Sequence, residues 1–96
     1  MYIKNENIVE RTIMPSYFLV DITKCYNNEY ENMFITDEIG IEMWRAISDG
    51  DTFEKILKKF LEKVIDDKSD NLQEIVRSDL KEFMGVLKNQ GYIYEV

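Results

Sequence analysis

The residue types that carry most enzyme chemistry are absent or isolated in this chain. Its 96 residues include no histidine, the commonest general base and metal ligand, and one cysteine, Cys25. A catalytic triad, a histidine-containing zinc site and a thiolate cluster therefore cannot be built within one copy of the chain. Cys25 follows Lys24 in an expected hairpin turn, where a reactive thiol and an incidental small residue are both open interpretations.

Carboxylates are the reactive groups that remain. The chain has 19 Asp and Glu residues against 12 Lys and Arg, for a net charge of −7. Pairs such as Asp66–Asp67 and Asp49–Asp51 offer oxygen ligands, but they lack the ladder of spaced ligands found in a calcium loop. The scattered glycines form no phosphate-binding loop. We therefore expect a protein that is not an enzyme and that needs no metal or cofactor.

Charge and hydropathy limit the classes of partner. An acidic chain is poorly suited to phosphate backbones, which are bound through Lys and Arg. Glu54 and Glu62 interleave with the main basic cluster, as is typical of a solvated helix face; that cluster comprises Lys55, Lys58, Lys59 and Lys63. The apolar runs are far shorter than the roughly 18 residues of a membrane span, and the N-terminus lacks a signal-peptide core. We expect one cytoplasmic domain over residues 1–96, with no nucleic-acid or membrane partner.

Three short strands are expected in the first third of the chain. Residues 1–7 are polar and expected to be flexible. Apolar and β-branched runs predict strands at 8–14, 17–23 and 30–35, with a tight turn at Asn27–Asn28 between the last two. Alternation places five apolar side chains on one face of this hairpin: Phe18, Val20, Ile22, Met33 and Ile35.

Helical spacing of apolar residues then predicts three helices. Asp37 or Thr36 can cap the first helix, Gly50 is expected to end it, and Thr52 can cap the second. The third helix runs from about residue 72 to 89 and ends at Gly91, before a tail or short strand. Strands followed by helices indicate an α+β fold, in which a three-stranded antiparallel sheet precedes three helices in a winged helix-turn-helix-like arrangement.

The apolar face of the third helix is wide. Its centre is formed by Leu72, Val76, Leu80, Phe83 and Leu87. Ile75 and Val86 widen the face on one side, with Asp79 between them, and Met84 widens it on the other. The resulting arc of about 180° exceeds the ~100° that packing on a single surface requires. Either the helix packs on both the sheet and another helix, or one flank lines a groove open to a partner.

An edge strand beside such a groove is a known mode of peptide recognition. An extended peptide adds to the open edge through backbone hydrogen bonds, and neighbouring side chains select its sequence. We expect the backbone of four residues to pair with the peptide: Asn32, Met33, Phe34 and Ile35. We expect four side chains to line the groove: Ile75, Asp79, Phe83 and Val86. For Phe83 a core role is the alternative.

Several segments occur in an order and spacing that point to one family. They are FLVDIT, MFITDEIGIEMW, ISDGDTFEKIL and SDLKEFMGVLKNQGYI. This pattern, over about residues 8–95, resembles the PqqD-like family of RiPP recognition elements, although Thr36 stands where the family has Asn. The resemblance implies a non-catalytic module that binds the leader of a ribosomally made precursor peptide as a strand beside the third helix. It also implies delivery of the precursor to a modifying enzyme, often a radical S-adenosylmethionine enzyme.

Two other classes of protein remain open. A winged-helix transcriptional regulator needs a basic recognition helix, and the third helix balances Arg77, Lys81 and Lys88 against three acidic residues. A homodimeric interaction protein would pair its own edge strands. Trp44 would serve such an interface, although core packing explains it more simply. We expect a monomer or a weak homodimer.

Overall fold

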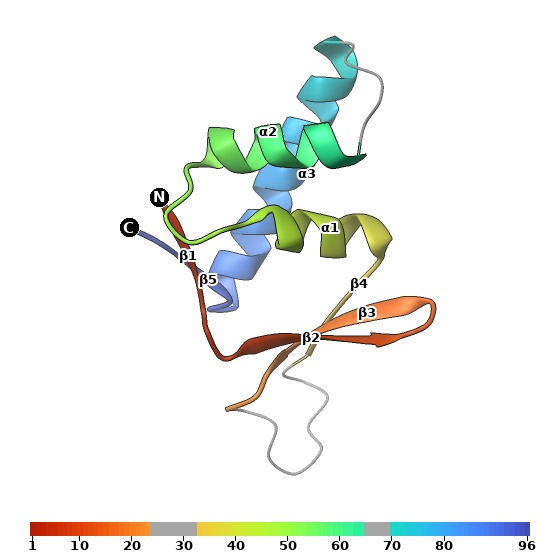
Figure 1. Ribbon diagram of the computed structural model, residues 1–96, viewed down its shortest axis with the longest axis vertical. Helices are drawn as coiled ribbons and strands as arrows, with labels where there is room; N and C mark the ends of the chain where they lie inside the picture. The colour runs from red at the N-terminus through yellow and green to blue at the C-terminus, as the bar shows by residue number, and fades with distance from the viewer. Residues whose placement is uncertain (24–32, 65–69) are drawn as a thin grey trace.

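The structure is a computed structural model that describes residues 1–23, 33–64 and 70–96. These residues form five strands and three helices, which Figure 1 shows in chain order. Their bounds are β1 Tyr2–Lys4, β2 Ile8–Ile13, β3 Ser16–Asp21, β4 Met33–Thr36, α1 Glu38–Ala46, α2 Phe53–Val64, α3 Asp70–Asn89 and β5 Ile93–Glu95.

The predicted fold class is confirmed. Strands β2, β3 and β4 form an antiparallel sheet in that order, and the three helices follow in the chain. The sheet lies below the helices in Figure 1, and the helices cover one of its faces. The result is an α+β fold of the winged-helix kind. The predicted turn at Asn27–Asn28 and the cysteine at position 25 lie outside the described residues.

Alternation along the strands is also confirmed, and the structure shows which face is which. Phe18 lies opposite Ile35, and Val20 lies opposite Met33, so these four apolar side chains share one face as expected. Ile22, the fifth residue expected on that face, lies beyond the end of β3 at Asp21. The opposite face carries Leu19, which is fully buried under the helices. The apolar residues grouped by the sequence therefore form the outer face of the sheet.

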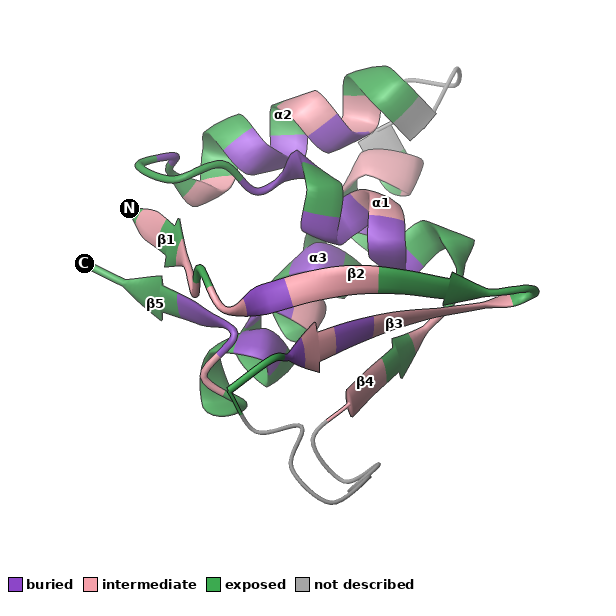
Figure 2. Ribbon diagram, turned by 60° about the horizontal axis from the view of Figure 1, so that its bottom comes forward, coloured by how far each residue is buried: buried purple, intermediate pink, exposed green. Residues whose placement is uncertain are grey.

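The core lies between the inner face of the sheet, the three helices and β5 (Figure 2). Its most buried side chains come from every helix and from two strands of different sheets: Leu19, Ile41, Ile47, Ile56, Phe60, Leu80, Leu87 and Ile93. Trp44 is also buried, as core packing predicts, and the Lys4 ammonium lies 4.3 Å from its ring centroid.

Three helix boundaries follow from local capping, as predicted. The Asp37 side chain accepts a hydrogen bond from Gly40 N at 2.9 Å at the start of α1, and Thr52 Oγ1 accepts one from Lys55 N at 3.3 Å at the start of α2. Gly91 stops α3 with φ of 78°. There, Tyr92 N donates to Leu87 O at 2.9 Å, which satisfies a carbonyl at the helix end.

Two expectations about local structure are wrong. Helix α1 ends at Ala46, four residues before Gly50, because Ile47 leaves the helix in an extended conformation and is buried. Gly50 instead lies in the turn before α2 with φ of 88°, and its N–H donates to Tyr2 O at 2.8 Å. This contact is made possible by the second difference, an ordered N-terminal strand.

Residues 1–7, which we expected to be flexible, contain strand β1. It pairs antiparallel with β5, so that Tyr2 lies opposite Glu95 and the two ends of the chain lie side by side (Figure 1). Val96 N donates to Met1 O at 2.8 Å. Backbone groups make these bonds, which is why polar side chains at the N-terminus did not prevent strand pairing.

Candidate functional site

Strand β4 forms one edge of the three-stranded sheet. It pairs with β3 on one side, and no other described strand pairs with its far side. In such an edge strand, every second residue directs its N–H and C=O away from the sheet, where an added strand can bind them. Three of the predicted pairing residues, Met33, Phe34 and Ile35, lie in β4. The fourth, Asn32, lies outside the described residues.

Helix α3 lies over the inner face of this edge. The Phe34 ring meets Phe83 of α3 edge-on, with ring centroids 5.8 Å apart and an interplanar angle of 71°. It also meets Tyr92, which follows α3, at 6.3 Å. The Tyr92 hydroxyl donates to the carbonyl of Leu19 in β3 at 3.5 Å. These contacts set the position of the C-terminal half of α3 relative to the sheet.

A hollow of about 440 Å³ opens between the start of α1 and α3, at the C-terminal end of β4. We call it the β4 hollow. It is lined by Thr36, Asp37, Ile39, Gly40, Met43, Asp79, Glu82, Phe83 and Val86. Met43 is buried and Phe83 is half-buried, whereas Ile39 is 49% exposed and Val86 is 39% exposed. The hollow therefore has an apolar floor and a rim of exposed apolar and acidic residues, and it lies beside an open strand edge.

The two flanks of the wide apolar face on α3 differ in burial. Met84, on one flank, is buried in the core. Ile75 and Val86, on the other flank, are exposed, and Asp79 between them is exposed as well. Asp79, Phe83 and Val86 meet in the β4 hollow, whereas Ile75 is 58% exposed and does not line it.

Sequence reasoning missed the α1 side of the β4 hollow. Ile39 and Met43 recur at helical spacing, which predicts an apolar face of α1, and of the two only Met43 is buried. The partial exposure of Ile39 depends on where α3 lies, and no local sequence pattern indicates the position of α3. Glu82 was also missed, although it lies three residues after Asp79 and hence on the same side of the helix.

Several acidic residues in other parts of the molecule form ion pairs. Arg45 binds both Glu10, at 3.0 Å, and Glu42, at 2.9 Å. Hydrogen bonding from Lys63 holds the pKa of Glu42 below its ordinary value. A hydrogen bond from Lys59 lowers the pKa of Asp51 in the same way.

The carboxylates of the β4 hollow differ. Asp79 and Glu82 are exposed and form no ion pair with any residue that the structure describes. Asp37 uses one oxygen to cap α1. The hollow therefore combines an apolar floor with uncompensated negative charge.

Most lysines of the α2 cluster form ion pairs within the chain. Lys55 and Lys59 lie 3.6 Å and 2.5 Å from the Asp51 carboxylate, and Lys63 lies 3.0 Å from Glu42. In the same way, Arg77 of α3 binds Glu54 of α2 through both of its terminal nitrogens. These pairs leave few free cations for a phosphate backbone on the described surface of α2 and α3.

A second, smaller hollow of about 250 Å³ lies on the other flank of α3. It is lined by Tyr2, Phe53, Lys81, Met84, Gly85, Lys88 and Glu95. The Lys88 ammonium lies 3.4 Å from the Glu95 carboxylate, and burial raises the pKa of Tyr2. Strands β1 and β5, which contribute Tyr2 and Glu95 to this hollow, pair with each other as a separate two-stranded sheet.

Two further features bear on the kind of site. Among residues 1–23, 33–64 and 70–96, no three Cys, Asp or Glu side chains are grouped so that they would hold a metal ion. None of the described helices has the length and apolar character needed to cross a membrane.

Comparison with known proteins identifies a shared fold. No family model and no curated protein matches the chain. A solved structure does match: TbiB1 in complex with the TbiA(beta) leader peptide. The match has a TM-score of 0.64 at 18% sequence identity, and it covers 97% of this chain and 95% of that chain. This likeness shows that the chain has the fold of TbiB1 over nearly its whole length.

Proposed function

We propose that this chain is a leader-binding module of the PqqD-like class of RiPP recognition elements, without catalytic activity of its own. The leader of a ribosomally made precursor peptide adds to β4 as an extended strand, and its side chains enter the β4 hollow. The observation that carries this proposal is the open edge of β4 directly beside an apolar hollow lined by α3. The fold shared with TbiB1, which was solved with a leader peptide, supports it.

The register of the sheet determines which residues of an added strand face α3 and which face outward. Phe34 and Thr36 point to the inner face, and Met33 and Ile35 point to the outer face. Leader residues opposite Phe34 and Thr36 then face α3 and the β4 hollow. Those opposite Met33 and Ile35 extend the apolar outer face of the sheet. Recognition thus combines backbone pairing with side-chain contacts on both faces.

The chemistry belongs to a partner in this proposal. The module holds the leader while a modifying enzyme, of the radical S-adenosylmethionine class or another class, acts on the rest of the precursor in the cytoplasm. Strand β4 has four residues, so it forms only a few hydrogen bonds, each worth about 1 kcal/mol net. An affinity near micromolar, about −8 kcal/mol, is expected.

The test is a titration of ¹⁵N-labelled protein with the leader of the precursor encoded beside it. Saturable amide shifts at residues 33–36 and along 79–86 are expected, and a scrambled leader is the matched control. Leaders N-methylated at alternate residues test strand addition itself. One alternate set removes the N–H groups that donate to β4 and abolishes binding, whereas the other set retains binding. Absence of shifts at millimolar leader contradicts the proposal.

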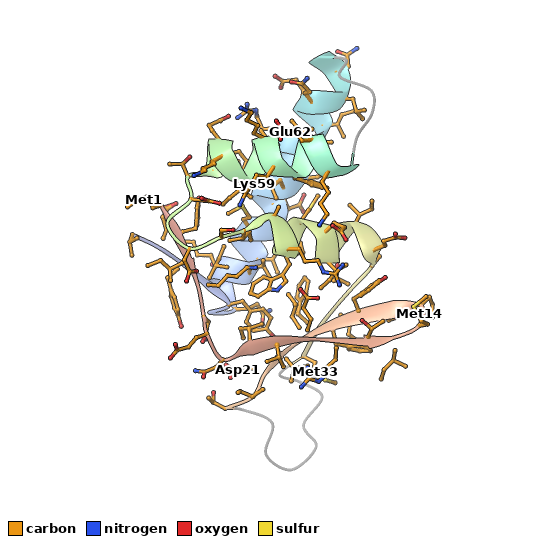
Figure 3. The ribbon with its side chains drawn as sticks, viewed as in Figure 1. Met1, Met14, Asp21, Met33, Lys59 and Glu62 are labelled. Carbon is orange, nitrogen blue, oxygen red and sulfur yellow. The ribbon has the colours of Figure 1, made fainter. Side chains whose placement is uncertain are left out.

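A second candidate function is self-association through the same edge. It is favoured by the outer face of the sheet, where Ile35 is 63% exposed beside Phe18 and Met33, which Figure 3 labels at the start of β4. Two copies pairing β4 with β4 would form one continuous six-stranded sheet. Sedimentation at two concentrations separates a dimer from a monomer. A dimer that dissociates on leader addition would show that both use one edge.

A further inference from the structure

We infer that the β4 hollow selects a basic residue in the leader, at the position opposite Thr36. This inference rests on the proposed function and adds the chemical class of the leader side chain that the β4 hollow binds. The occupant is the side chain of Arg or Lys, with its aliphatic stem on the floor of the hollow and its cationic head at the carboxylates of α3.

The position follows from the geometry of β4. Thr36 points to the inner face of the sheet, because its cross-strand partner Tyr17 packs against the core, and it lines the β4 hollow. A residue opposite Thr36 on an added strand also points inward. Its side chain therefore enters the hollow, whereas its two neighbours point to the outer face.

The floor of the hollow fits a long aliphatic stem. Ile39 and Met43 from α1 face Phe83 and Val86 from α3 across about 440 Å³. Arg and Lys bury three or four methylene groups along such a surface while their charged heads stay at its rim. A short side chain would leave the floor in contact with water, so a long one is favoured.

The charge of the rim decides between a basic and an apolar occupant. Asp79 and Glu82 line the hollow three residues apart on α3, and neither has an ion-pair partner among the described residues. An apolar side chain would remove water from these carboxylates without replacing its hydrogen bonds. A cationic head replaces them, and an acidic residue is repelled. Some carboxylates elsewhere, such as the exposed Glu54 and the buried Asp51, have basic partners within the chain.

The test uses three acetylated heptapeptides in one alternating Thr–Val frame, with arginine, norleucine or glutamate at the centre. Each is titrated into the full-length ¹⁵N-labelled protein, and the amide shifts of residues 33–36 report binding at β4. We expect the arginine peptide to bind about fivefold tighter than the norleucine peptide, in line with one partly exposed ion pair. The glutamate peptide should bind most weakly. Raising salt from 0.05 M to 0.5 M should remove most of the arginine advantage.

Variants of the rim residues test whether the carboxylates cause the tighter binding of the arginine peptide. The double variant Asp79→Asn, Glu82→Gln should bind the arginine and norleucine peptides equally. Glu62→Gln is the matched control, because Glu62 is an exposed residue of α2 far from the sheet (Figure 3), and it should keep the fivefold difference. All three side chains are exposed, so thermal unfolding should confirm that each variant folds.

The outcomes separate this inference from the function on which it rests. Equal affinity of the three peptides, with shifts at β4, overturns the basic-residue inference and leaves leader binding intact. An arginine advantage that survives in the double variant also overturns it. If no peptide shifts β4 amides, the basic-residue inference is overturned, and the titration with the precursor leader separately decides whether a leader adds to β4.

Discussion

Gly40 of α1 lies directly against Thr36 at the end of β4. A Cβ atom on residue 40 would overlap Thr36 Oγ1 and lie 3.0 Å from Thr36 Cβ. Asp37, between them, caps α1 by accepting from Gly40 N at 2.9 Å. The edge strand and α1 can therefore approach closely because residue 40 has no side chain, and both Gly40 and Thr36 line the β4 hollow.

Gly40→Ala should destabilise the protein for this reason. Overpacking against Thr36 costs about 1–3 kcal/mol, and the better helix propensity of Ala returns up to about 1 kcal/mol. We expect a net loss of about 1–2 kcal/mol in the free energy of unfolding, measured by urea denaturation. In a Thr36→Ala background, where Oγ1 and Cγ2 are absent, Gly40→Ala should cost less. An equal cost in both backgrounds would show that the contact is unimportant.

Gly85→Ala should have the opposite effect. Gly85 lies within α3, and apart from its chain neighbours and the backbone of its own helix no heavy atom lies within 4 Å of the position that its Cβ would take. Ala is favoured over Gly in a helix by about 1 kcal/mol, so the free energy of unfolding should rise by about that amount. The same urea experiment measures it and serves as the control for Gly40→Ala. A loss of stability would mean that α3 is not a regular helix at this point.

Val86 and Ile75 provide a matched pair for leader binding. Both are exposed apolar residues on the same flank of α3, but only Val86 lines the β4 hollow. Val86→Ser should weaken binding of the precursor leader about threefold to tenfold, since it removes most of an apolar contact of about 1 kcal/mol. Ile75→Ser should leave the affinity unchanged, and each variant should unfold within about 0.5 kcal/mol of the parent. Equal weakening by both would extend the site along α3, as the sequence suggested.

Asp51 should make stability depend on acid pH. Its carboxylate accepts a hydrogen bond from Lys59 and lies near Lys55, so its pKa in the folded protein is below the ordinary value. The folded state therefore binds this proton less readily than the unfolded state. The contribution of Asp51 is complete above about pH 5, and it is lost as pH falls through about 3.9 and below.

Urea denaturation at several pH values between 3 and 7 measures this dependence. The variant Asp51→Asn should unfold more easily at pH 7 and should lose less stability on acidification. Glu62→Gln, which removes an exposed carboxylate without a described ion pair, should keep the slope of the parent. Parallel curves for Asp51→Asn and the parent would contradict the assignment to Asp51.

The helices and most of their boundaries follow from interactions between residues that are close together in the sequence. The cap at Asp37 needs only a carboxylate three residues before a free N–H, and the stop at Gly91 needs only a residue that tolerates positive φ. Alternation likewise placed Phe18 and Ile35 on one face of the sheet. Such features depend on neighbours within a few residues, so a single sequence reports them. The expected ligand, by contrast, came from the resemblance to a family.

Contacts between distant segments were decided by the tertiary structure. Pairing of Tyr2 with Glu95 uses backbone groups that every residue has, so no pattern of side chains predicts this pairing. The outer position of Ile35 and the exposure of Ile39 follow from where the helices cover the sheet. The β4 hollow likewise exists because α1 and α3 approach one end of β4 from different directions. Residues as far apart as Ile39 and Val86 meet there only after the whole core has formed, because burial depends on packing between elements and not on local spacing.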